Sequence, residues 1–114
     1  MDNDKLYIQH ILDSINSIEE YTGTVDKEDF LINRGNKMMR AAVIREFEVI
    51  GEAVKNLSEE IKKSHPDLPW REITSMRNKL IHEYFGVNMQ IVWGAIQEDL
   101  PILKKAMKEL LGLL

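Results

Sequence analysis

The chain has 114 residues, a net charge of −4 and no cysteine. Its length suits a single domain over residues 1–114, and the missing thiols exclude disulfides, thiolate metal ligands and a cysteine nucleophile. Apolar runs fall well short of the ~20 residues of a membrane span, and the acidic start lacks the features of a secretory signal, so we expect a cytoplasmic protein with no membrane contact.

The N-terminal third predicts one long helix and one short helix. Isoleucines recur at helical spacing, which predicts an amphipathic helix over residues 2–21 that ends near Gly23. Residues 25–32 then predict a short helix, with Thr24 or Asp26 as its N-cap and acids in its first turn.

The centre of the chain carries the longest periodic pattern. Apolar residues step by four, four, three, four and three positions, which predicts a helix of about 22 residues opening at Gly35-Asn36. The stripe consists of Met39, Val43, Phe47, Ile50, Val54 and Leu57. Ser58 follows as the predicted N-cap of a short helical turn.

A proline-containing loop over residues 64–69 leads to the next predicted helix, which starts at Pro69 and stops at Gly86. Ile73, Met76, Leu80 and Tyr84 form its apolar stripe.

Asn88 is the predicted cap of the last helix, whose apolar pattern continues from Val92 to Leu114. Pro101 lies inside this pattern and predicts a kink near residues 97–100. No strand pattern occurs in the sequence. The fold prediction is therefore all-α, a four-helix up-down bundle with short additional helices in the connections.

A basic segment interrupts the acidic chain. No acid occurs between Asp29 and Glu46, and the cations there are Arg34, Lys37, Arg40 and Arg45. One interpretation is a solvated helix face; the other is a local patch that attracts RNA phosphates.

The chemically richest stretch places Arg77, His82 and Tyr84 within eight positions. Histidine exchanges protons near neutral pH, and arginine holds two phosphate oxygens at once. Such a pair suits phosphodiester cleavage in which the base takes a proton from an RNA 2′-hydroxyl and the arginine stabilises the transition state. That mechanism uses the nucleophile of RNA itself, so it requires neither a metal ion nor a cofactor.

Helical geometry sets a condition on this site. At 100° per residue, Arg77 and Tyr84 lie about 20° apart around the helix axis, whereas Arg77 and His82 lie about 140° apart. One regular helix does not bring Arg77 and His82 together, so we expect a two-fold dimer to combine two motifs in one cleft.

The same residues also fit structural roles without chemistry. An isolated helical histidine is commonly a surface residue without a role, and Tyr84 on an apolar stripe suits a half-buried core tyrosine. No second histidine follows His82 at the spacing of a zinc-protease helix, and His10 with Asp13 supplies too few ligands for a metal site.

Several ordered segments resemble the HepT-like toxins of the HEPN superfamily. Arg77 to Tyr84 matches the R-x4-H-x-Y signature, residues 47–53 resemble an E-x-I-G-E-A segment, and residues 65–73 resemble an H-P-x-x-P-W-x-x-I lead-in. The resemblance implies a dimeric, all-α HEPN bundle and a metal-independent endoribonuclease, the toxin of a type VII HepT/MntA-like toxin–antitoxin pair.

The resemblance also implies roles for single residues. Arg77 and His82 would be catalytic, Asn78 and Glu52 would support them, and Tyr84 would receive AMP from an MntA-like nucleotidyltransferase antitoxin. The alternative is a non-catalytic helical module that binds nucleotides or serves as an accessory partner of a minimal nucleotidyltransferase.

Overall fold

A computed structural model describes residues 3–32, 34–75 and 88–114, without the side chain of Arg34. Within these ranges the chain is all-α, as predicted. The α-helices are α1 (Asp4–Thr22), α2 (Lys27–Ile32), α3 (Lys37–Lys55), α4 (Glu59–Ser64), α6 (Met89–Gly94) and α7 (Leu100–Leu113). A 3-10 turn (Arg34–Asn36) precedes α3, a π-helical turn (Ala95–Asp99) joins α6 to α7, and residues 70–75 are also helical.

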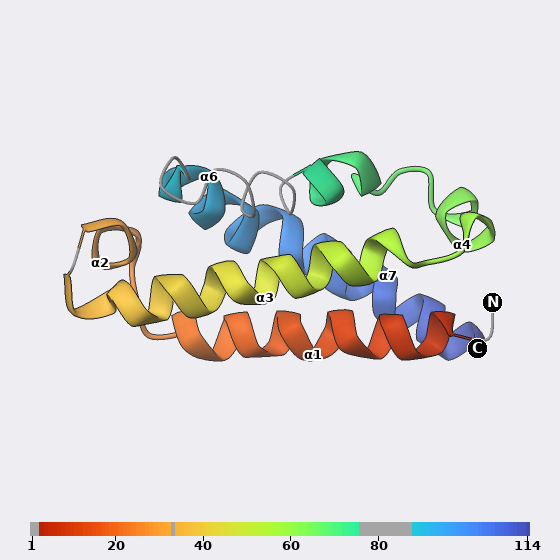
Figure 1. Cartoon of the computed structure of the whole chain (residues 1–114), viewed down its shortest axis with the longest axis horizontal. Coiled ribbons are helices and arrows are strands. Elements are labelled where there is room, and N and C mark those ends of the chain that lie inside the picture. The colour runs from red at the N-terminus through yellow and green to blue at the C-terminus, as the bar shows by residue number, and fades with distance from the viewer. Residues whose placement is uncertain (1–2, 33, 76–87) are drawn as a thin grey trace.

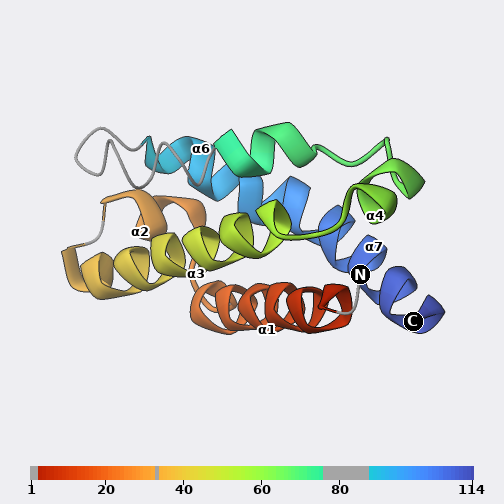
Figure 2. The same cartoon turned by 45° about the vertical axis from the view of Figure 1, so that its right-hand side comes forward.

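The long helices α1 and α3 lie side by side in opposite directions, and α7 packs against α1 (Figure 1). The short helix α2 packs against α6, and both termini lie at the same end of the molecule (Figure 2). Residues 70–75 are the described part of the helix predicted from Pro69 to Gly86, and the rest of that prediction lies outside the described residues. The up-down order of four helices therefore stays a prediction.

The core follows the predicted apolar stripes. Ile8, Ile11, Ile15 and Ile18 of α1 have no exposed surface, and each such side chain contributes about 1.5–3 kcal/mol by leaving water. The α3 stripe meets them, with every member buried except the half-buried Met39. On α7 the matching residues are Leu100, Leu103, Met107 and Leu110. The periodicity therefore identified the packed faces of all three long helices.

Three of the predicted helix caps form hydrogen bonds. Asp26 Oδ1 accepts from the Asp29 amide at 2.8 Å, so Asp26 rather than Thr24 caps α2. Ser58 Oγ accepts from the Ile61 amide at 3.3 Å, and Asn88 Oδ1 accepts from the Gln90 amide at 2.9 Å. Each cap satisfies a first-turn amide that has no partner within its own helix.

The π-helical turn lies where a kink was predicted before Pro101. Pro101 has no amide hydrogen, so an α-helical bond to the Gln97 carbonyl is missing at this point. The amide of Leu100 instead donates to the Ala95 carbonyl, five residues back. The apolar pattern is thereby carried from α6 into α7 with one wide turn between them.

Among the described residues, no helix combines the length and apolar character that crossing a membrane would require.

Candidate active site and the groove beside Glu52

The predicted catalytic residues Arg77 and His82, the supporting Asn78 and the modification site Tyr84 all lie outside the described residues. The structure does describe the helical segment 70–75 that leads into them in the sequence. It also describes Glu52 and the basic residues of α3.

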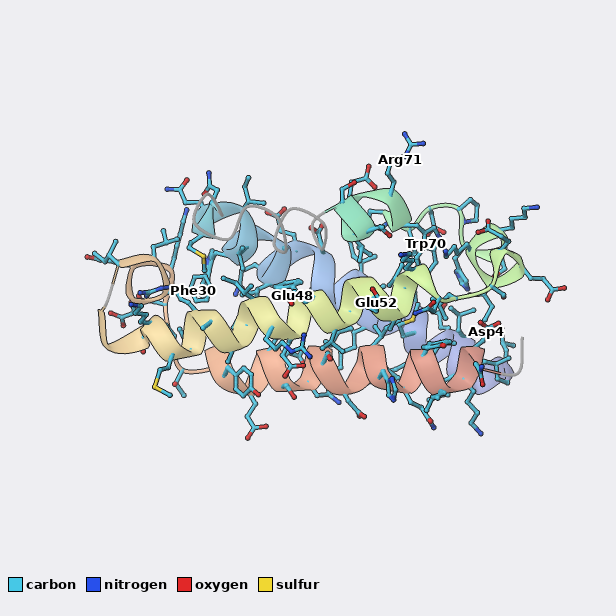
Figure 3. All side chains as sticks on the ribbon, in the orientation of Figure 1. Asp4, Phe30, Glu48, Glu52, Trp70 and Arg71 are labelled. Carbon is cyan, nitrogen blue, oxygen red and sulfur yellow. The ribbon has the colours of Figure 1, made fainter. Side chains whose placement is uncertain are left out.

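Trp70 anchors the start of this segment. Its Nε1 donates to the His65 carbonyl at 2.9 Å, and its ring packs against the core. The amide of Ile73 donates to the Pro69 carbonyl at 3.0 Å, which places the helix start where the sequence predicted it. Figure 3 shows Arg71, the next residue, directed away from the bundle. The segment before Arg77 is therefore tied to the core at its first turn.

Two carboxylates lie at a small cavity beside this segment. Glu72 and Asp99 help to line an opening of about 40 Å³ whose walls include Phe47 and Ile50 of α3. Burial, then the charges of Glu98 and Glu72, raise the pKa of Asp99 above its ordinary value of 3.8. The carboxyl group of Asp99, at the end of the π-helical turn, therefore holds its proton more tightly than that of an isolated aspartate.

Glu52 lies on a groove between α1 and α3. The groove has a volume of about 250 Å³, and Tyr7 and His10 of α1 form part of its wall. Figure 3 shows Glu48 and Glu52 on the same helix, one turn apart. The supporting residue predicted from the sequence thus faces an opening that accepts a small group.

The groove is lined by groups of both charges. Arg45 Nη1 lies 3.4 Å from Glu48 Oε2, and the Asn56 Nδ2 donates to the Glu52 carbonyl at 3.0 Å. The rings of Tyr7 and His10 meet edge to face with their centroids 6.5 Å apart. Donors, acceptors and aromatic surface are therefore all available within one opening.

The four basic residues do not share one environment. Arg45 lines the groove, and Lys37 is exposed at the start of α3. The Arg40 Nη1 donates to the Phe30 carbonyl at 3.0 Å, which ties α3 to α2. Arg34 belongs to the 3-10 turn, and its side chain lies outside the described part of the chain. Of the three basic residues whose side chains the structure describes, Arg45 alone lines the groove with Glu52.

Sequence reasoning missed Tyr7, Glu48 and Asn56 as possible site residues, and it considered His10 only as a metal ligand. A signal existed on α3, because Arg45, Glu48, Glu52 and Asn56 step by three, four and four positions and so form a polar stripe. The pairing with Tyr7 and His10 had no such signal, because it depends on how α1 packs. In the described ranges no three histidines or carboxylates gather as a metal site would need.

Comparisons with known proteins identify relatives over nearly the whole chain. The family model "Ribonuclease HepT-like" matches residues 11–110. The "Probable ribonuclease HepT" of Thermococcus cleftensis is 45% identical over 106 residues, which cover 93% of this chain and 94% of that protein. The "Putative RNase TTE0752" of Caldanaerobacter subterraneus is 44% identical over 92% of this chain and 91% of its own length.

A third relative, "Putative RNase MJ1380" of Methanocaldococcus jannaschii, is 40% identical over 89% of this chain and 90% of its own length. No solved structure matches significantly. The family match spans every described helix at least in part, together with the R-x4-H-x-Y signature from Arg77 to Tyr84. The chain therefore belongs to the HepT-like ribonuclease family.

Proposed function

We propose that the protein is a metal-independent endoribonuclease and the toxin of a HepT/MntA-like toxin–antitoxin pair, acting on RNA in the cytoplasm. The observation that carries this proposal is the family match over residues 11–110, which includes an intact Arg77–His82–Tyr84 motif. The names of the relatives, "Probable ribonuclease HepT" and "Putative RNase", support the same activity.

In the proposed reaction, the imidazole of His82 takes the proton of an RNA 2′-hydroxyl. The freed oxygen attacks the adjacent phosphorus, and the bond to the 5′-oxygen breaks as the protonated His82 returns its proton to that oxygen. A 2′,3′-cyclic phosphate remains on the upstream fragment, and the downstream fragment leaves with a 5′-hydroxyl. The guanidinium of Arg77 stabilises the charge that develops on the phosphate oxygens, with Asn78 as a supporting polar group. Because the nucleophile is the 2′-hydroxyl, DNA is not cleaved.

The active cleft of the proposal combines two chains. On a regular helix Arg77 and His82 point about 140° apart, so one copy does not converge them on a single phosphate. A two-fold dimer places the motif of each chain beside that of its partner.

Tyr84 is the proposed off-switch. A nucleotidyltransferase partner would transfer AMP to its phenol oxygen, forming a phosphodiester and releasing pyrophosphate from ATP. The added group carries negative charge and bulk on the side of the helix that holds Arg77. RNA phosphate would then be excluded without unfolding the protein.

The test is incubation of the purified protein with RNA, with and without EDTA. We expect fragments that end in a 2′,3′-cyclic phosphate, unaffected by EDTA and absent with His82→Ala or Arg77→Ala. Cleavage that survives His82→Ala, or that EDTA stops, would contradict the mechanism. A folded dimer that binds a nucleotidyltransferase but never cuts RNA would instead identify a non-catalytic partner.

A further inference from the structure

The groove between α1 and α3 is the right size for a single flat ring system. Its volume of about 250 Å³ lies below the ~300–1,000 Å³ of pockets that enclose drug-sized ligands. Tyr7 and His10 give one wall two aromatic rings in edge-to-face contact. Unpaired RNA bases stack on such rings, which makes a nucleobase a suitable occupant.

The charges in the groove also favour a nucleotide over a simple ion. Glu48 and Glu52 disfavour a lone anion, and Arg45 disfavours a lone cation. A nucleotide satisfies both signs, because its neutral base carries N–H donors while its phosphate carries negative charge.

The ion pair between Arg45 and Glu48 can be broken at a small cost in free energy. Their contact is 3.4 Å long, and the Arg45 side chain is 72% exposed. Exposed ion pairs of this kind contribute about 0–1 kcal/mol. Arg45 can therefore turn to a phosphate while the carboxylate of Glu48 accepts from a base.

Asn56 adds a fixed polar group to the same wall. Its Nδ2 donates to the Glu52 carbonyl at 3.0 Å, which orients the amide. The Oδ1 of that amide supplies a further acceptor to the same groove, about two helical turns from Glu48. The wall of α3 therefore presents mainly acceptors to the edge of a bound base.

We propose that this groove binds one unpaired guanine of the RNA substrate. The guanine ring lies flat against one ring of the Tyr7–His10 pair and meets the other at its edge. Its Watson–Crick edge meets Glu48, and a neighbouring phosphate meets Arg45. Guanine is the base with two adjacent donors on that edge, N1–H and the N2 amino group, and these match the two oxygens of one carboxylate. The inference rests on the proposed function, since it names the base of the RNA substrate that the proposed ribonuclease recognises.

Binding to the cleavage-silenced His82→Ala protein tests the proposal apart from catalysis. Four labelled uridine heptamers carry G, A, C or U at the centre, and affinities are measured by fluorescence anisotropy. We expect about tenfold tighter binding of the G-containing RNA, and loss of that preference with Glu48→Gln, since one well-paired base edge discriminates by roughly this factor. The matched control Glu20→Gln, an exposed acid of α1, keeps the preference.

Arg45→Ala separates the phosphate contact from the base contact. It should weaken all four RNAs equally and reduce the slope of log affinity against log salt by about 0.7, the value for one single-strand phosphate. Lys108→Ala, an exposed cation of α7, should leave slope and preference unchanged. Guanosine 5′-monophosphate should also shift the ring NMR signals of Tyr7 and His10 more than adenosine 5′-monophosphate does.

Equal affinity for the four RNAs, with no effect of Glu48→Gln, would overturn the guanine site. A second result would also overturn it: Tyr7→Leu and Glu48→Gln weaken dimerisation in sedimentation without changing base preference. The groove would then be a contact between two copies of the chain. RNA cleavage by the wild-type protein without base preference leaves the proposed function intact and removes this inference. Guanine-selective binding without RNA cleavage supports the guanine site and contradicts the proposed ribonuclease function.

Discussion

The carboxylate of Asp4 holds Ser58 through two hydrogen bonds, although 54 residues separate them in the sequence. Asp4 accepts from the Ser58 amide at 2.9 Å and from the Ser58 hydroxyl at 2.7 Å. The same hydroxyl oxygen accepts from the Ile61 amide and caps α4. One nearly buried carboxylate therefore joins the start of α1 to the segment that leads towards Trp70 (Figure 3).

Asp4→Ala should lower the free energy of unfolding by about 1–3 kcal/mol, because two donors of Ser58 lose their acceptor in a nearly closed site. Urea denaturation followed by circular dichroism measures the change. Asp13→Ala removes an exposed carboxylate from the same helix and should change stability by less than about 0.5 kcal/mol. Equal effects of the two substitutions would contradict the role of the Asp4 contact.

Phe30 should be the most sensitive position of α2. Its side chain has no exposed surface, and the centroid of its ring lies 5.1 Å from the ring centroid of Trp93. Phe30→Ala should cost about 3–5 kcal/mol, since it leaves a cavity between α2 and α6. Thermal melting followed by circular dichroism measures this loss. Ile32→Ala, on the same short helix but 67% exposed, should leave the melting temperature nearly unchanged. A melting temperature unaffected by Phe30→Ala would show that α2 adds little to the core.

Two glycines in right-handed helical conformation should respond oppositely to alanine. Among the described atoms, an added Cβ at Gly94 meets nothing within 4 Å, so Gly94→Ala should stabilise the fold by about 0.5–1 kcal/mol through its helix propensity. At Gly23 the Cβ would lie 3.0 Å from the Glu19 carbonyl oxygen, and Gly23→Ala should destabilise. Calorimetric melting temperatures that move in the same direction would contradict this contrast.

Asp99 should make stability depend on pH. Burial, with Glu98 and Glu72, raises its folded pKa above the ordinary 3.8, so the folded chain binds the proton more tightly than the unfolded chain. The contribution of Asp99 to stability therefore falls as pH rises from 3.8 through the raised pKa, and the ionised form costs stability at neutral pH.

Asp99→Asn should accordingly be more stable than the wild type at pH 7, by no more than about 1 kcal/mol because water screens this exposed side chain. The difference should vanish below pH 3.8. Denaturation curves across that range measure it, with Glu20→Gln as the control for general charge. A gain that persists undiminished in acid would point to a cause other than ionisation.

Co-expression with a nucleotidyltransferase of the proposed antitoxin type should add adenylyl groups to Tyr84. Intact-mass and peptide mass spectrometry would locate them, and growth of the host should recover at the same time. Tyr84→Phe has no phenol oxygen to accept the group, so it should stay unmodified and keep arresting growth. An unmodified Tyr84 beside an active partner enzyme would count against the switch.

Local features of this chain could be predicted from its sequence. The caps Asp26, Ser58 and Asn88 and the apolar stripes depend on contacts within one or two turns, and helical periodicity sets those contacts directly. The predicted central helix was too long, since α3 ends at Lys55, although Leu57 of the predicted stripe is buried beyond that end. Burial alone therefore does not mark where a helix ends.

The sequence by itself was enough to predict the described long helices α1, α3 and α7 with their packed faces, and to identify the family motif from Arg77 to Tyr84, because each of these depends on spacings of a few residues. Only the tertiary structure decided that Asp4 reaches Ser58 and that Tyr7 and His10 line one groove with Glu48. Those pairings join residues dozens of positions apart. They depend on which helix faces bury the most apolar surface against each other, and that choice is made by the packing of the whole core.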